Sequence, residues 1–352
     1  MPNPEVVTNY KDSDGVDLGK KLISKDYLIS VYPQIADQLI TPELWIWGLN
    51  QFGSTGDNTT INRNTPVTTL SGGPNWKQVS GGIGCAAIKT DGTLWTWGYN
   101  SYGQLGINDS THRSTPVTTF AGGTNWKQVS IGPRITAAVK TDGTLWTWGG
   151  AIDLFGALGT NDNTNRYTPV TTFAGGTNWK QVACGSHTTA IKTDGTLWTW
   201  GRNAYGQLGD NTTTDRSTPV TTFAGGTNWK QVSGRNQTAA IKTDGTLWVW
   251  GRNGYGELGT NDDTGRLTPV TTFAGGTNWK QVSGGRFVSS AIKTDGTLWV
   301  WGLNTYGNGG TNGGGSKATP VTTFAGGTNW KQVDGGTYIT AAIKTSDDLI
   351  GI

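Results

Sequence analysis

An internal repeat of about fifty residues restricts the fold of this chain more than any other feature. A Leu-Trp-x-Trp-Gly string and an Asn-Trp-Lys-Gln-Val string each occur six times, and together they contain all 18 tryptophans. A Thr-Pro-Val segment also recurs once in each copy. Repeats of this length are typical of solenoids and propellers, in which each copy forms one supersecondary unit.

Each copy predicts four short strands. In chain order they are Lys-Gln-Val, Ala-Ala-Ile-Lys, Leu-Trp-Thr-Trp and Pro-Val-Thr-Thr. Five copies carry Asp-Gly between the second and third strands, and this pair is a strong hairpin signal because the turn needs positive φ. The recurring proline opens the fourth strand and places it at the outer edge of the sheet. Four-stranded units at a fixed period predict the blades of a β-propeller.

The two ends of the repeat region indicate how such a ring would close. The region begins at Leu44 in a third strand and ends near Ile343 in a second strand. A solenoid needs atypical capping repeats, whereas these copies stay uniform. We therefore expect an all-β propeller of six four-stranded repeats over residues 44–352, closed by pairing of the half-blades 44–70 and 330–345. Seven blades are the alternative, with residues 349–352 and 1–43 supplying strands.

Composition and charge exclude several classes of function. Charged residues make up 14% of the chain and its formal net charge is +3, which is too small for a strong nucleic-acid or membrane footprint. No apolar run has the length of a membrane span, and residues 1–15 lack the pattern of a signal peptide. Cys85 and Cys184 lie in repeats that are not neighbours, so we expect no disulfide between them.

Residues 1–43 lie outside the repeats. Ser24 is a candidate cap for a short helix running toward Val31, with Pro33 ending it and with Leu18 and Leu22 on its apolar face. We expect this segment to dock the chain onto protein partners in a larger assembly.

The six copies differ mainly in two sets of loops. Strand direction alternates, so the first–second and third–fourth loops share one face, and these are the loops that diverge. The opposite face carries the nearly constant strings Lys-Thr-Asp-Gly-Thr and Thr-Thr-Phe-Ala-Gly-Gly-Thr-Asn-Trp-Lys. Recognition usually resides in variable loops on a rigid scaffold, although neutral drift after duplication is the alternative. The predicted partner-binding residues are Tyr99, Arg134, His187, Arg202, Arg235, Arg252, Arg286, Phe287 and Tyr338.

Three further patterns favour structural over chemical roles. His187 is interpreted as a loop histidine bonded to the backbone, and because His112 is the only other histidine, no multi-histidine metal site is expected. Asp and Asn strings in the third–fourth loops suit turns better than calcium. A cationic residue precedes each Thr-Pro-Val strand. Each cation either pairs with a nearby carboxylate in its own blade, or the six together form a rim that collects anions. These residues are Arg63, Arg113, Arg166, Arg216, Arg266 and Lys317. We expect no cofactor and no catalytic activity.

The segment from His187 to Pro219, HTTAIKTDGTLWTWGRNAYGQLGDNTTTDRSTP, resembles the regulator-of-chromosome-condensation repeat. The resemblance covers residues 44–352 and implies a propeller, typically seven-bladed. The stretch VDLGKKLISKDYLISVYPQ at 16–34 is similar to leaders of phage structural proteins that carry this repeat. These resemblances imply that the chain is a virion component. It would contact either assembly partners or a protein or glycan on the host surface. The alternatives are a lectin-like binder and a cytoplasmic regulator of nucleotide exchange or chromatin.

Overall fold

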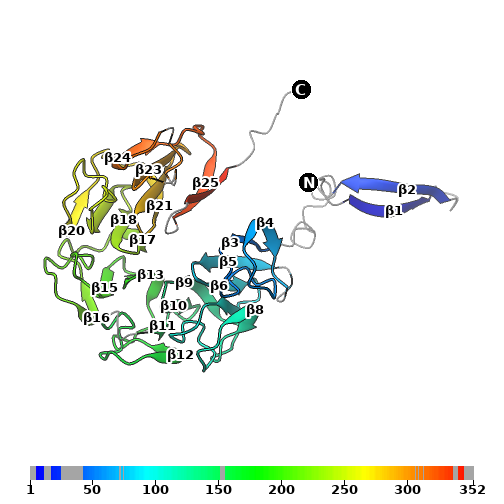
Figure 1. Ribbon diagram of the computed structural model, residues 1–352, viewed down its shortest axis with the longest axis horizontal. Coiled ribbons are helices and arrows are strands. Elements are labelled where there is room, and N and C mark those ends of the chain that lie inside the picture. Colours follow the sequence, from blue (N-terminus) through cyan, green and yellow to red (C-terminus); the bar gives the residue numbers. More distant parts are fainter. Residues whose placement is uncertain are drawn as a thin grey trace.

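The computed structural model describes residues 5–11, 17–24, 43–70, 73, 75–150, 155–305, 307, 309–311, 313–335 and 340–344. Every regular element in these ranges is a β-strand, as the all-β prediction requires (Figure 1). Within the same ranges, no helix is long and apolar enough to cross a membrane.

Five complete blades follow one another along the chain. Each is a four-stranded antiparallel sheet whose strands pair in chain order. The first strands are β5 (Trp76–Gly81), β9 (Trp126–Ile131), β13 (Trp179–Cys184), β17 (Trp229–Gly234) and β21 (Trp279–Gly284). The second strands are β6 (Gly84–Lys89), β10 (Ile135–Lys140), β14 (His187–Lys192), β18 (Gln237–Lys242) and β22 (Val288–Lys293). The third strands are β7 (Leu94–Gly98), β11 (Leu145–Gly149), β15 (Leu197–Gly201), β19 (Leu247–Gly251) and β23 (Leu298–Gly302). The outermost strands are β8 (Arg113–Thr118), β12 (Arg166–Thr171), β16 (Arg216–Thr221), β20 (Arg266–Thr271) and β24 (Lys317–Thr322).

The Asp-Gly turns form where the sequence predicts them. In the turn between β18 and β19, Gly245 has φ +80° and its N–H donates to the Lys242 carbonyl at 3.0 Å. Asp244 stabilises the loop by accepting the Thr246 N–H at 2.9 Å.

The recurring proline differs slightly from its predicted place. Pro219 lies within β16, not at its start, and the strand tolerates it because β16 is the sheet edge.

Neighbouring blades are joined by side chains that bond backbone. The Gln78 amide donates to the Val129 carbonyl at 2.8 Å and accepts the Val129 N–H at 3.0 Å. The same reciprocal pair joins Gln231 to Val282, and three further interfaces repeat it. The buried second tryptophan of the third strand also reaches the preceding blade, and Trp250 donates to the Gln207 carbonyl at 2.9 Å. The tryptophans therefore pack between blades, as their period-two spacing suggests.

The predicted closure by half-blades is not formed. Among the described residues, β3 (Trp45–Gly48) pairs only with β4 (Arg63–Thr68), and β25 (Trp330–Gly335) pairs only with β26 (Thr340–Lys344). These two sheets are the two ends of the arc in Figure 1. Trp47 is consequently 56% exposed and Ile343 57% exposed, although their equivalents in the complete blades are buried. Because the five interfaces that carry the glutamine–valine pair repeat the same contacts, they set a similar rotation per blade, and six repeats at this rotation leave the arc open.

The N-terminal segment contains a hairpin that was not predicted from the sequence. β1 (Glu5–Lys11) pairs antiparallel with β2 (Asp17–Ser24). The placement of Leu18 and Leu22 on a helical face is therefore wrong, because both residues belong to a strand. The remainder of the predicted helix, residues 25–33, lies outside the described residues.

The glycine of each Asp-Gly turn provides a test of the contact between one blade and the next. A methyl group on Gly245 would collide with the Thr277 carbonyl, which belongs to the next blade connection. Gly225 also has positive φ, +54°, but a methyl group there would meet nothing within 4 Å. Gly225→Ala should lower the free energy of unfolding by about 1 kcal/mol through backbone strain alone. Gly245→Ala should cost roughly 2 kcal/mol more, because the collision is added to the strain. Urea denaturation measures both values, and equal losses would contradict this packing.

Candidate functional site

The first–second and third–fourth loops meet on one face of the blades, which we call the individualised face. Thr136 Oγ1, at the start of β10, donates to the carbonyl of Gln104 in the preceding third–fourth loop at 2.7 Å. Thr238 and Gln207 repeat this bond at the next-but-one interface. The opposite, uniform face is made by the Asp-Gly turns and blade connections, where the backbone N–H of Trp279 donates to the Gly245 carbonyl at 3.0 Å. The assignment of the variable loops to one face is thus confirmed.

The loops that follow β15, β19 and β21 form a cluster of cationic and aromatic side chains on the individualised face. We call it the Arg252 cluster. The Arg252 guanidinium lies 5.0 Å from the ring centroids of Tyr255 and Phe287 and 5.9 Å from that of Tyr205. Its Nε is 3.8 Å from Oε1 of the fully buried Glu257. Burial raises the pKa of the Glu257 carboxyl, and Arg252 opposes that shift. The cluster therefore holds an arginine side chain, still 21% exposed, in a fixed orientation.

Two of the other predicted arginines extend this cluster. Arg202 lies 5.8 Å from the centroid of the Tyr205 ring, so that one tyrosine adjoins two guanidinium groups. Arg286 is exposed and lies 4.9 Å from the Phe287 ring. Arg202, Arg252, Arg286 and Phe287 were each singled out by sequence, and the structure brings them together.

A second aromatic group lies on the earlier blades. Tyr99 stacks on His112 with centroids 5.0 Å apart, and Phe52 contacts both rings. Arg134 lies 4.6 Å from the Tyr102 ring centroid. Tyr99 and Arg134 therefore belong to a different group from Arg252, and the predicted residues form two clusters instead of one continuous rim.

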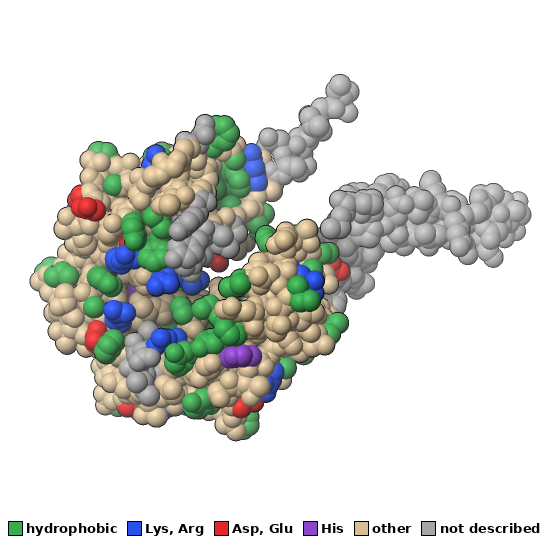
Figure 2. Space-filling model, viewed as in Figure 1, with side chains coloured by type: hydrophobic (Ala, Val, Ile, Leu, Met, Phe, Trp, Pro, Cys, Tyr) green, Lys and Arg blue, Asp and Glu red, His purple; other side chains and the backbone are tan. Residues whose placement is uncertain are grey.

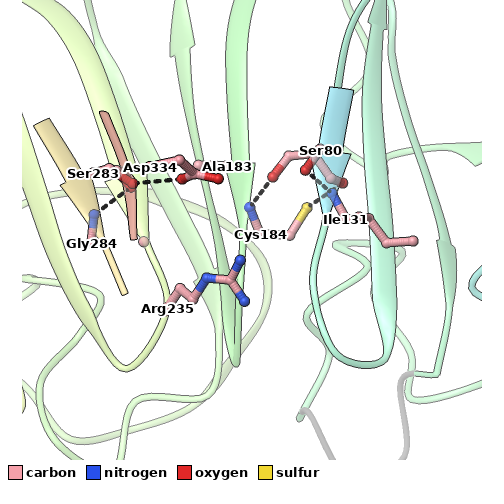
Figure 3. Close-up of a pocket in the computed structure, with 11 residues that line it drawn as sticks. Ser80, Ile131, Ala183, Cys184, Arg235, Ser283, Gly284 and Asp334 are labelled. Atoms are coloured by element: carbon pink, nitrogen blue, oxygen red, sulfur yellow. Dashed lines mark hydrogen bonds between the residues drawn. The ribbon is translucent and has the colours of Figure 1, made fainter. Parts of the chain in front are cut away.

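Arg235 lines the central cavity, where the first strands of the repeats converge (Figure 3). Its Nη2 donates to the Gly81 carbonyl at 3.3 Å, which connects the loop after β17 to β5. Serine hydroxyls line the same cavity, and Ser283 donates to Asp334 at 2.7 Å. The cavity is polar and contains both a cation and a carboxylate.

His187 is not available to a partner, which corrects its inclusion among the binding residues. Its side chain is fully buried, and its Nε2 lies 2.6 Å from Thr238 Oγ1. Thr238 uses its only hydrogen to bond the Gln207 carbonyl, so His187 must donate from Nε2. Burial lowers the pKa of His187 to about 4, and the ring is held neutral as a packing residue. Tyr338, the last predicted binding residue, lies outside the described residues.

The outer arginines have in-blade partners, as the structural interpretation predicted. Arg113 pairs with Asp109, Arg166 with Asp162 and Arg266 with Asp262, each at 2.6 Å; Arg63–Asp57 and Arg216–Asp210 complete the series. The same carboxylates accept backbone N–H groups in their turns, as Asp262 does from Thr264.

No group of three or more potential metal ligands occurs within the described part of the chain. The buried thiols of Cys85 and Cys184 are free, and burial raises the pKa of each to about 12.

Charge is distributed unevenly over the visible face. Lys and Arg side chains surround its centre in Figure 2, whereas most visible Asp and Glu side chains lie toward the outer edge. Tyr205, Tyr255 and Glu257 were not predicted from the sequence, although they lie in a Tyr-Gly-x-Leu-Gly string that recurs in the third–fourth loops. Glu257 was detectable in principle, because Gln104 and Gln207 occupy its position in two other copies.

A sequence model of the regulator of chromosome condensation (RCC1) repeat matches residues 91–139, 142–191, 194–241 and 244–292, more than half of the chain. A second model of the same repeat matches residues 179–207. The chain belongs to the RCC1 repeat family. Among curated proteins, the ultraviolet-B receptor UVR8 of Arabidopsis thaliana is 42% identical to this RCC1-repeat chain over 72 residues, 20% of this chain and 16% of the receptor.

Solved structures share the RCC1-type fold over most of the chain. Human WBSCR16 aligns with a TM-score of 0.75 at 23% identity, over 86% of this chain and 82% of that one. Yeast RCC1 (Prp20), in a complex with Kap60, aligns with a TM-score of 0.74 at 18% identity, over 87% of this chain and 77% of that one. At these identities the likeness establishes the propeller fold.

The buried His187 predicts a specific pH dependence of stability. The unfolded chain protonates this residue as the pH falls through about 6.5, whereas the native state does so only near pH 4, so stability is lost as the pH falls between these values. The expected loss is about 3 kcal/mol. His187→Gln, which places the residue of position 237 at position 187, should remove this loss. Urea unfolding of both proteins at pH 7 and pH 4 measures the difference, and identical losses would refute the buried neutral histidine.

Proposed function

We propose that this protein is a non-enzymatic binding propeller that recognises a protein partner with its individualised face. The observation that carries the proposal is the Arg252 cluster, in which a guanidinium is held among Tyr205, Tyr255 and Phe287 on loops of three successive blades. Arginine and tyrosine are enriched at binding hot spots, and the aromatic rings around Arg252 already restrict its side chain before a partner binds. A repeated scaffold with individualised loops supports the same role.

The class of partner is supported by charge and by the related structures. Arg202, Arg252 and Arg286 gather on one face, so the complementary surface is acidic. Solved structures of yeast Prp20 are described with Kap60, Gsp1p and histones, which are proteins. Binding in place of catalysis is supported by the packed state of the groups best suited to chemistry: His187 and both thiols are buried, and their pKa values oppose ionisation.

A matched pair of triple variants tests the proposal in the full chain. Arg252→Gln, Tyr255→Ala and Arg286→Ala remove two cations and one aromatic ring from the individualised face. Lys230→Ala, Phe223→Ala and Lys280→Ala remove the same chemistry from exposed positions toward the uniform face. The immobilised first variant should lose at least tenfold of its capture of the partner from extracts of the source cells, and the second should retain it. Thermal unfolding verifies that both are folded, and equal capture by both would overturn the proposal.

A more specific role, as a virion component attached through residues 1–43, rests on the similarity of the leader at 16–34 to leaders of phage structural proteins. It implies localisation on the virion and contact of the individualised face with an assembly partner or with the host surface. Deletion of residues 1–43 should leave a folded propeller that no longer co-sediments with virus particles in a density gradient. Unchanged co-sedimentation of the shortened chain would contradict attachment through this segment.

A further inference from the structure

Two neighbouring third–fourth loops share one backbone hydrogen bond but differ in the chemistry of the side chain that accepts it. Arg202, Tyr205 and Gln207 in the loop after β15 correspond to Arg252, Tyr255 and Glu257 in the loop after β19. In both loops the side chain at the last position accepts the tyrosine N–H: Gln207 Oε1 does so at 2.8 Å and Glu257 Oε2 at 2.6 Å. In the second loop the remaining atom is an oxygen, Oε1, 3.8 Å from Arg252 Nε. In the first loop the remaining atom is a nitrogen.

This difference leaves two donors without an acceptor. Arg202 Nε and Gln207 Nε2 are buried and lack hydrogen-bond partners among the described residues. Turning the Gln207 amide over does not resolve this, because its NH₂ group would then face the Tyr205 N–H. Gln104, the equivalent residue two copies earlier, meets no such problem, since its Nε2 donates to the Pro133 carbonyl at 3.0 Å. Buried donors without partners are rare in native proteins, because each has lost its hydrogen bonds to water without a replacement.

We propose that the Arg202–Gln207 pair receives a carboxylate from an acidic segment of the partner protein. One carboxylate accepts hydrogen bonds from the Arg202 guanidinium and from Gln207 Nε2, and so takes the place that Glu257 holds beside Arg252. Tyr205 is 47% exposed, and its ring adjoins both guanidinium groups.

The surroundings favour a protein carboxylate. Arg252 and Arg286 place further positive charge nearby, which attracts a run of acidic residues. Glu257 already places a carboxylate oxygen 3.8 Å from Arg252 Nε, whereas Gln207 offers Arg202 no such oxygen. The inference rests on the proposed binding function and specifies which group of the partner is recognised.

Anisotropy titration of the full chain with a fluorescein-labelled peptide of twelve glutamates tests the site, with a peptide of twelve glutamines as the probe control. Gln207→Glu supplies the missing acceptor internally, and Arg202→Ala removes the main donor; each should weaken binding of the acidic peptide at least tenfold. Lys230→Ala changes the net charge by the same amount at an exposed position away from the site and should leave binding unchanged. Glu257→Gln recreates the unfilled arrangement beside Arg252 and should strengthen binding.

Several outcomes would overturn the inference. Binding by Gln207→Glu as tight as that of the unaltered chain would do so, as would equal weakening by Lys230→Ala, which would indicate general charge attraction. Binding of a heparin dodecasaccharide with no binding of the glutamate peptide would assign the site to a sulfated glycan instead. If Gln207→Glu still captures the cellular partner while the Arg252→Gln, Tyr255→Ala, Arg286→Ala variant does not, the carboxylate site is wrong and the binding function stands. Thermal unfolding checks every variant, and glutamate is already accommodated at the equivalent position 257.

Discussion

The reciprocal hydrogen bonds between a glutamine side chain and a valine backbone organise the whole molecule. In each of these pairs the amide of one blade both donates to and accepts from the first strand of the next blade, at 2.8 to 3.2 Å among the five interfaces that carry it. Such a pair satisfies two backbone groups that a separate sheet would leave open at its inner edge. It fixes the distance and the rotation between blades, and the loops are positioned accordingly.

A constant interface permits variable loops. The tryptophan that donates to the preceding third–fourth loop bonds a backbone carbonyl, as Trp250 does with Gln207 and Trp301 with Glu257. Because the contact uses the main chain, the side chain at that position is free to change from glutamine to glutamate. The Arg252 cluster arises from such changes, and its guanidinium is held in place by the same scaffold that holds the blades together.

Much of the fold was predictable from sequence, and the reasons are local. The Asp-Gly turns, the strand order and the unpaired thiols follow from turn chemistry, period and spacing. The open arc was not predictable, because the position of its two ends depends on the sum of many small rotations between blades that no single residue encodes. Four of the nine predicted binding residues meet in one cluster, whereas His187 proved to be buried, since a repeat pattern does not distinguish a loop tip from the first residue of a strand. Glu257 acquires its importance only from Arg252, five residues away and brought close by the turn.

The identity of the blade interfaces has a consequence at the level of the gene. Each repeat carries the same interface residues, so a gene rearrangement that replaces one repeat by another exchanges one set of third–fourth loops and preserves the glutamine–valine contacts. A copy gained or lost in the same way alters the length of the arc and the number of loop sets together. Exchange of repeats within the gene therefore changes the contact surface while the blade interfaces stay the same.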